Sequence, residues 1–209
     1  MDQLAQYLPS LLSVALVVVV GAISPGPDFA MVVRNSLVYS RKSGLAAALG
    51  VSVGLLVHVT YTLLGIGIII AESTYLLLII KYCGSGYLFY IGCKGLLAKK
   101  SSASVGNFEH AKDITITKAF VSGFLTSILN PKTILFFVSI LSAMIDLSTP
   151  PSVLMIYAIM IFLEVLIWFS FVAFCLSGKA TRMKFYSIKH WIERATGAIL
   201  IALALRILL

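Results

Sequence analysis

Charged residues are scarce in this sequence. Asp, Glu, Lys and Arg make up only 11% of the 209 residues, and hydrophobic residues make up 60%, whereas soluble domains carry about 25% charged residues. The mean hydropathy is +1.03, and apolar stretches long enough to cross a bilayer recur along the chain. The composition excludes an ordinary soluble protein and predicts an all-α, polytopic membrane protein.

Cysteine is also scarce. The three cysteines, Cys83, Cys93 and Cys175, all fall within apolar stretches, and no two of them form a CxxC pair. We therefore expect small buried thiols rather than a disulfide or a metal site. The sequence contains no recognisable spacing of a nucleophile and its base, so we expect neither enzymatic activity nor a cofactor.

Acidic residues number 8 against 16 basic ones, which gives a formal net charge of +8. The basic residues lie in short loops between apolar stretches, so they indicate membrane topology and no nucleic-acid partner. The loops after the first, third and fifth expected spans hold nearly all of them, and the loops after the second and fourth hold none. The positive-inside rule then places both termini outside the cytoplasm.

Six membrane spans are expected from the apolar stretches. They cover approximately residues 8–33, 44–71, 75–98, 118–143, 152–176 and 191–208. A long polar stretch separates the first three spans from the last three. The expected organisation is therefore a first three-helix repeat over 1–98, a cytoplasmic linker over 99–117 and a second three-helix repeat over 118–209. The start of the chain, Met1-Asp2-Gln3, lacks the basic residues of a signal peptide, so we expect the first helix to be retained.

The run Ser24-Pro25-Gly26-Pro27-Asp28 interrupts the first span. A proline removes a backbone donor and clashes with the preceding turn, and glycine makes the break easier. We expect the helix to stop near Ser24 and to restart near Pro27, with Asp28 in the new first turn. The freed amides favour an anion and Asp28 favours a cation, a combination that suits an amino-acid zwitterion.

A second break interrupts the fourth span at Leu129-Asn130-Pro131-Lys132, the equivalent place in the second half. Ser24 and Asn130 precede the prolines and are expected to cap the restarted helices. With the breaks aligned, Glu164 falls opposite His58, in the middle of the second span of each half. Three spans in each half require the second half to be inserted upside down, and such inverted repeats with broken first helices are typical of secondary transporters.

The candidate substrate-binding residues are those at the two breaks. Asp28 has two interpretations, a ligand of the substrate ammonium or proton carrier and a cap of the restarted helix. Lys132 pairs with Asp28 or meets a substrate carboxylate, and Asn130 is a cap or a ligand. The full predicted set is Pro25, Gly26, Pro27, Asp28, Asn130, Pro131 and Lys132.

Other ionisable and aromatic side chains fall within the expected spans, where charges normally face a partner or a cavity. Desolvation favours a protonated carboxyl, so Glu164 is a candidate proton carrier alongside Asp28, or else a packed, hydrogen-bonded acid. His58 is a further proton-coupling candidate, with a simple hydrogen-bonding role as the alternative. Tyr61 and Trp168 are expected to line the cavity or to serve in packing.

The quoted motifs resemble those of the LysE/RhtB family of bacterial amino-acid exporters. The resemblance covers nearly the whole chain and rests on Ser24-Pro25-Gly26-Pro27-Asp28, Arg34-Asn35, Gly44-Leu45, Tyr87-Leu88-Phe89-Tyr90-Ile91-Gly92, Phe120-Val121-Ser122-Gly123-Phe124 and Leu129-Asn130-Pro131-Lys132. It implies a six-span exporter in the inner membrane, driven by the proton motive force. Related carriers of thiol electrons place cysteines beside the prolines; this chain has none there, which argues against a redox role.

The function expected from these observations is proton-coupled export of a small amino acid or a derivative. The alternative is a small-ion or metal-ion efflux carrier on the same scaffold, which would need more carboxylate, Met, Cys or His ligands. Gly50 and Gly54 have GxxxG spacing, which lets another helix approach closely and also makes a homodimer conceivable.

Overall fold

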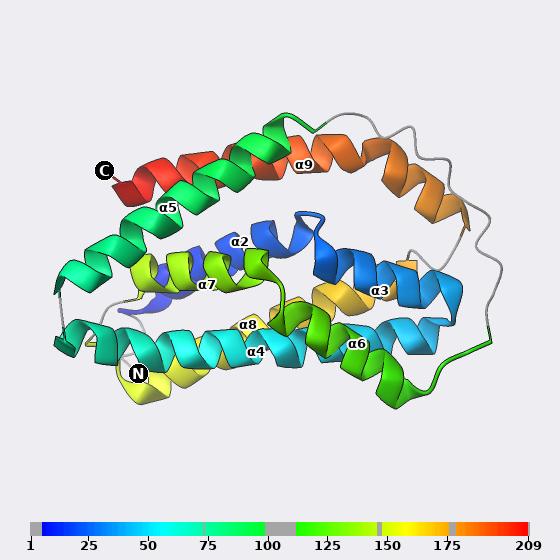
Figure 1. Ribbon diagram of the computed structural model, residues 1–209, viewed down its shortest axis with the longest axis horizontal. Coiled ribbons are helices and arrows are strands. Elements are labelled where there is room, and N and C mark those ends of the chain that lie inside the picture. Colours follow the sequence, from blue (N-terminus) through cyan, green and yellow to red (C-terminus); the bar gives the residue numbers. More distant parts are fainter. Residues whose placement is uncertain (1–5, 73, 99–111, 146–147, 176–178, 209) are drawn as a thin grey trace.

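The computed structural model describes residues 6–72, 74–98, 112–145, 148–175 and 179–208 (Figure 1). Most of the expected cytoplasmic linker, residues 99–111, lies outside this described part. The described residues form helices and no strand. The helices are α2 (Leu8–Ile23), α3 (Pro27–Val38), α4 (Arg41–Glu72), α5 (Thr74–Leu96), α6 (Ile116–Ile128), α7 (Pro131–Met144), α8 (Pro151–Cys175) and α9 (Lys179–Leu208).

Both predicted breaks are present, and both restarted helices begin at a proline. The axis turns by 57° between α2 and α3 and by the same 57° between α6 and α7. The prediction that the first helix stops near Ser24 and restarts at Pro27 is confirmed, as is the break before Pro131. Local steric rules for proline therefore determine where the chain bends.

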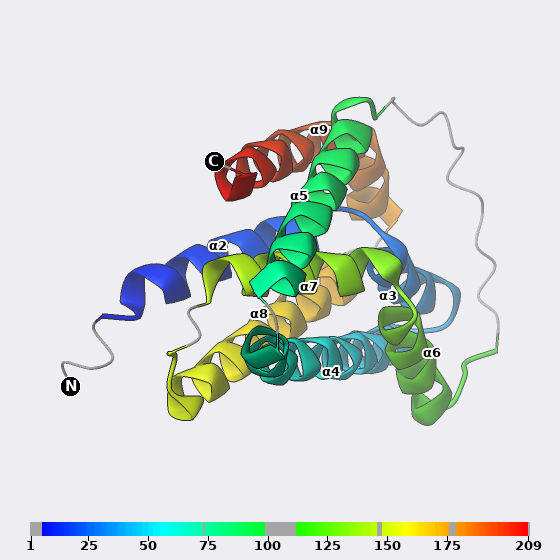
Figure 2. The same cartoon turned by 60° about the vertical axis from the view of Figure 1, so that its left-hand side comes forward.

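Helices α2, α3 and α7 of the two broken pairs occupy the middle of the molecule, whereas α6 lies beside α4 (Figures 1 and 2). In Figures 1 and 2, α2, α3 and α7 lie between a layer of α5 and α9 and a layer that contains α4 and α8. Helix α5 packs mainly against α9, and α4 packs against both α6 and α8. The α5–α9 pair thus forms a side wall beside the breaks, and α5 joins this wall to α7.

Glycines allow the closest helix contacts. A Cβ atom on Gly50 would overlap the carbonyl oxygen of Phe120, and one on Gly123 would overlap that of Ala47. The expected close approach at Gly50 and Gly54 is therefore made by α6 of the same chain. These two glycines consequently give no support to a homodimer, which stays a prediction.

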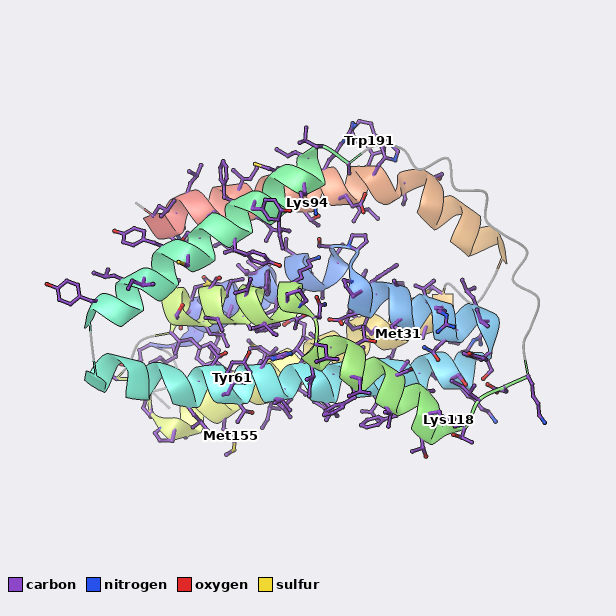
Figure 3. The ribbon with its side chains drawn as sticks, in the orientation of Figure 1. Met31, Tyr61, Lys94, Lys118, Met155 and Trp191 are labelled. Carbon is purple, nitrogen blue, oxygen red and sulfur yellow. The ribbon has the colours of Figure 1, made fainter. Side chains whose placement is uncertain are left out.

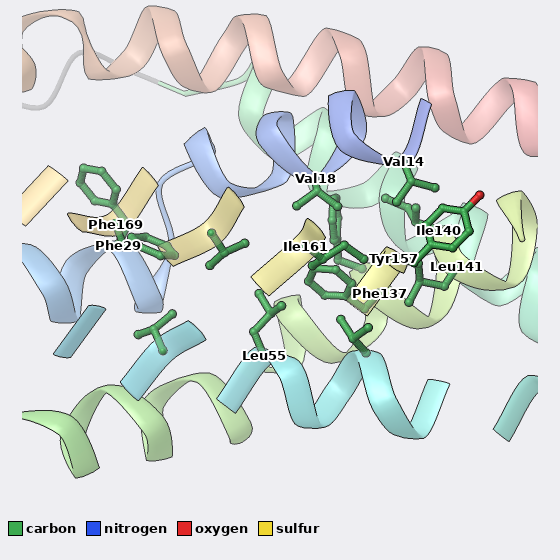
Figure 4. Close-up of a cluster of buried hydrophobic side chains, with 14 of the residues drawn as sticks. Val14, Val18, Phe29, Leu55, Phe137, Ile140, Leu141, Tyr157, Ile161 and Phe169 are labelled. Atoms are coloured by element: carbon green, nitrogen blue, oxygen red, sulfur yellow. The ribbon is translucent and has the colours of Figure 1, made fainter. Parts of the chain in front are cut away.

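Buried apolar side chains fill the space between α2, α4, α7 and α8 (Figure 4). Val14, Ile140 and Ile161 are fully buried there. This packing joins the two broken pairs to the unbroken helices, so the breaks are held by a packed core on one side.

Membrane-length helices are present among the described residues. Arg41–Gly65 and Pro151–Cys175 each qualify by length and hydropathy, and each bent pair qualifies when its two helices are taken together, which gives up to four spans. Large apolar side chains point outward, with Leu16 and Ile167 each 69% exposed, as expected against lipid. The chain is a multi-pass membrane protein. The spans predicted at 75–98 and 191–208 correspond to α5 and α9, and their membrane crossing stays a prediction.

Candidate functional site at the two helix breaks

The first break leaves Asp28 buried at the start of a helix. Helix α2 ends as Ser24 N donates to Val20 O, and α3 begins as Ala30 N donates to Gly26 O at 2.9 Å. Asp28 lies in the first turn and is only 8% exposed, as predicted. The prediction that Ser24 caps α3 is wrong: Gly26 is the capping residue, with no side-chain bond, and the Ser24 hydroxyl has another partner.

The second break is capped by a side chain. The Asn130 side-chain oxygen accepts from Lys132 N at 3.0 Å, and Ile134 N donates to Asn130 O. Asn130 is 4% exposed, so water does not compete for this bond. The predicted cap at Asn130 is confirmed, while its second interpretation as a substrate ligand stays a prediction.

Removing this cap is expected to destabilise the protein. Asn130→Ala leaves the Lys132 amide without its acceptor in a buried place, at about 0.5–2 kcal/mol for a lost cap. Thermal unfolding of the purified protein in detergent should show a lower Tm for Asn130→Ala, with most of the loss restored in Asn130→Ser, because serine also caps helices. Equal Tm values for all three proteins would contradict a capping role.

The two breaks are joined by side chains of α7. Lys132 Nζ donates to both the carbonyl oxygen and the hydroxyl of Ser24, each at 2.9 Å. Thr133 Oγ1 donates to Asp28 Oδ2 at 2.9 Å. The first turn of α7 therefore forms hydrogen bonds to residues on both sides of the first break, Ser24 and Asp28. The charges of Lys132 and Asp28 act on each other, but the hydrogen bonds of the Lys132 ammonium go to Ser24. The other interpretation, that Lys132 meets a substrate carboxylate, stays a prediction.

Asp28 retains an unused acceptor. Its Oδ1 atom is buried and forms no hydrogen bond with any described residue, although Asn130 lies near enough to influence the carboxylate. The ammonium of Lys132 is a charge that acts on this carboxylate. A buried carboxylate with one free oxygen beside an ammonium group has the composition of a site for a small zwitterion.

A cavity of about 40 Å³ lies beside these groups, and we call it the inner cavity. A water needs about 10–15 Å³ of such volume, so there is room for roughly three waters. Its polar wall comes from both breaks and includes Ser24, Asp28, Asn130, Lys132 and Thr133. Its apolar wall includes Val18, Phe29, Leu55, Phe136, Phe137, Val165 and Phe169. The arrangement combines opposite charges with an aromatic pocket.

His58 is hydrogen-bonded rather than open to the inner cavity. Its Nε2 lies 3.0 Å from Ser127 O and its Nδ1 lies 3.1 Å from the Tyr61 hydroxyl. Because the carbonyl only accepts, Nε2 carries the proton, and Tyr61 donates to Nδ1 in the neutral ring. Neither residue is among those lining the inner cavity. The His58 side chain links α4 to the end of α6, beside the second break.

Glu164 and Trp168 lie one helical turn apart on α8, and neither lines the inner cavity. Their neighbours Val165 and Phe169 line it instead. Glu164 Oε2 and Trp168 Nε1 are buried without a hydrogen-bond partner among the described residues. Glu164 is therefore a carboxyl group next to the cavity wall, and it does not line the cavity with the polar groups of the breaks.

The structure adds residues that sequence reasoning missed. Thr133 binds Asp28 directly, and Phe136 and Phe137 face the inner cavity from the next turn of α7. Thr133 follows Lys132 in the first turn of the restarted helix, and that position was the available signal. The part of the chain that the structure describes contains no group of three or more His, Cys, Asp or Glu side chains placed to hold a metal ion.

The chain is similar to a known family of translocators and to bacterial proteins named as membrane or efflux proteins. The family profile described as LysE type translocator matches residues 19–209. The uncharacterized membrane protein YrhP of Bacillus subtilis is 31% identical over 99% of this chain and 98% of its own length. The threonine efflux protein of Escherichia coli is 32% identical over 90% of this chain and 92% of its own. The leucine efflux protein of Salmonella choleraesuis is 32% identical over 60% and 58%, respectively. No solved structure matches the chain.

Proposed function

The chain belongs to the LysE type translocator family, and we propose that it exports a small amino acid or a derivative across the inner membrane of a bacterium by proton antiport. Its family is one of transporters, which supports a role as a carrier rather than an enzyme. Relatives that carry a functional name include threonine and leucine efflux proteins.

The junction of the two breaks carries this proposal. Asp28 Oδ1 has no hydrogen-bond partner among the described residues and would accept from the substrate ammonium. Lys132, now held by Ser24, would turn to the substrate carboxylate. Charge-assisted hydrogen bonds of this kind are the strong ones, and they are stronger away from water.

The inner cavity suggests how the substrate side chain would be held. Four phenylalanines, two valines, a leucine and an alanine line it, so an apolar side chain would fit there better than a charged one. Threonine and leucine differ in their side chains and share only the ammonium and carboxylate groups. We infer that the charged backbone groups of the substrate are recognised at the breaks and that the side chain is sorted by its size in the phenylalanine pocket.

The inner cavity is too small for an amino acid in this conformation. Binding would require α7 to move from the first break, which breaks the Lys132–Ser24 and Thr133–Asp28 hydrogen bonds. In a pair of inverted repeats, such a movement would expose the site to one membrane side at a time. The positive-inside rule supports an orientation with both termini in the periplasm.

Counter-flow in proteoliposomes tests the function. Purified protein would be reconstituted with unlabelled amino acids inside, and the uptake of labelled amino acids would be followed with and without a pH gradient. We expect counter-flow of at least one amino acid with an apolar or small side chain, stimulated when protons flow in the opposite direction. Uptake of no amino acid together with transport of an inorganic cation would favour the ion-carrier alternative.

We propose that the transported proton is carried by Glu164 or His58, with Asp28 as the third candidate. Glu164→Gln is expected to keep counter-flow, because the residue does not line the inner cavity, and to lose the stimulation by the pH gradient, because an amide carries no proton. His58→Gln is the comparison variant in the same assay. A normal gradient response in Glu164→Gln would remove this residue from the proton pathway.

A further inference from the structure

A second, larger cavity lies on the other side of the first break. It has a volume of about 470 Å³ and is lined by the turn Ser24–Pro27, by α5 and by α9. We call it the vestibule. Its volume falls within the range of small-molecule sites. Lys94, labelled in Figure 3, projects into this region from α5, near the turn that joins α2 to α3.

The vestibule and the inner cavity share one wall. Ser24, Gly26 and Lys132 line both cavities. The Lys132 ammonium is held by Ser24 at 2.9 Å, and a Cβ on Gly26 would lie 3.4 Å from the Lys132 Cδ and Nζ atoms. The Lys132 side chain therefore lies against the turn of the first break and separates the two spaces.

Charged groups of both signs face the vestibule. Glu193 comes from α9 and Lys94 from α5, with the Lys94 ammonium 5.3 Å above the ring of Tyr90. Tyr87 lies beside Tyr90, with their ring centroids 6.4 Å apart. Such a lining offers a carboxylate, an ammonium, two hydroxyl groups and aromatic faces, which are the groups that recognise a small zwitterion.

Lys132 lies between two carboxylates, one on each side of the shared wall. Asp28 in the inner cavity and Glu193 in the vestibule are the acids whose charges act on it. An ammonium placed in this way is attracted to both sides. A substrate ammonium bound at Glu193 would weaken that side of the attraction and favour movement of Lys132 away from the vestibule.

We propose that the vestibule is a second amino-acid site, in series with the one at the breaks, in which Glu193 binds the substrate ammonium and Lys94 binds its carboxylate. This inference rests on the proposed export function. The Lys132–Ser24 contact is the partition that the amino acid passes on its way to Asp28. An anionic lipid headgroup is the competing occupant, and Glu193 disfavours it by charge repulsion.

Thiol protection tests the second site directly. The three native cysteines, which form no disulfide among the described residues, are replaced by serine, and Ala98→Cys is introduced at a position that lines the vestibule. The rate of reaction with a water-soluble thiol reagent is measured with increasing L-threonine, L-leucine or glycerol 3-phosphate. We expect an amino acid to slow the reaction in a saturable way. Lys118→Cys, exposed on α6, is the control whose reaction rate should not change.

The decisive variants separate the two sites. Protection should persist when Asp28→Asn is added, because the vestibule does not contain Asp28, and Glu193→Gln should raise the half-protecting concentration by about tenfold or more. Glu193→Asp should restore part of the affinity. Loss of protection with Asp28→Asn, protection by glycerol 3-phosphate alone, or no protection at all would overturn the second site. Failure of the export function would appear separately, as absent counter-flow in the unmodified protein.

Discussion

Asp28→Asn is expected to abolish amino-acid export while leaving folded protein in the membrane. The amide keeps the size of the side chain, and Thr133 still has an oxygen to which it donates. It loses the charge that would hold the substrate ammonium and that acts on Lys132. Removing one member of a buried charge pair costs about 2–5 kcal/mol, which corresponds to a loss of roughly thirtyfold or more in transport rate. Counter-flow and Tm are to be measured on the same preparation.

The same substitution at Asp113 is the matched control. This carboxylate lies outside the membrane spans, is exposed, and accepts from Ser43 Oγ at 2.7 Å. That hydrogen bond holds the pKa of Asp113 below its usual value, but the residue has no contact with either cavity. Asp113→Asn should therefore export normally. If Asp28→Asn exported as fast as the unmodified protein and only its Tm fell, Asp28 would be a helix cap and the substrate assignment would fail.

Gly50→Leu is expected to prevent folding. Even a Cβ atom at this position overlaps the carbonyl oxygen of Phe120 and presses on the amide of Phe124. These are backbone atoms of α6, so the strain is relieved only by separating α4 from α6. Gly50→Ala should be destabilised by about 1–3 kcal/mol, as for an overpacked core, and the leucine variant should give little monodisperse protein in size-exclusion chromatography.

Gly65 provides the control on the same helix. A Cβ atom there has no described neighbour within 4 Å, and alanine has a higher helix propensity than glycine by about 1 kcal/mol. Gly65→Ala should match or exceed the unmodified protein in Tm, and Gly65→Leu should remain monodisperse. Normal behaviour of Gly50→Leu would show that α4 and α6 are not packed through this glycine.

Separating α4 from α6 would also disturb the second break. His58 on α4 binds the carbonyl oxygen of Ser127, three residues before Asn130. The glycine contacts therefore place the end of α6, and with it the start of α7 and Lys132, against the first break. Under the proposed function, export would depend on the same interface between α4 and α6 as folding does, so the export assay needs folded protein as its reference.

The backbone features of the site were predictable. Proline sterics act between adjacent residues, so the sequence predicts the breaks, the position of Asp28 in a first turn and the cap at Asn130. The small size of Gly50 and Gly54 also predicts that another helix approaches closely there, but the sequence does not tell that this helix is α6. The cap expected at Ser24 is absent because α3 begins at Pro27, which makes Gly26 the capping residue. The Ser24 hydroxyl accepts from Lys132 instead, a residue far away in the chain.

The side-chain partners were not predictable. Nearly all faces of α4 and α8 carry apolar residues, because lipid and protein core are both apolar. No periodicity in the sequence therefore tells which face of each helix meets the other helices. For this reason the sequence singled out Glu164 and Trp168 on α8, whereas Val165 and Phe169 line the inner cavity. The phenylalanines of α7 were missed for the same reason, whereas Thr133 was missed although its place in the first turn of the restarted helix was an available signal.

By itself, the sequence determined that the chain is a helical membrane protein and where its two helices break, because those properties depend on composition and on neighbouring residues. Only the tertiary structure decided that Lys132 binds Ser24, that Thr133 binds Asp28, and that the first break separates a small inner cavity from a larger vestibule. Such contacts depend on how each helix is rotated and packed, and packing in an apolar solvent is set by shape across the whole molecule.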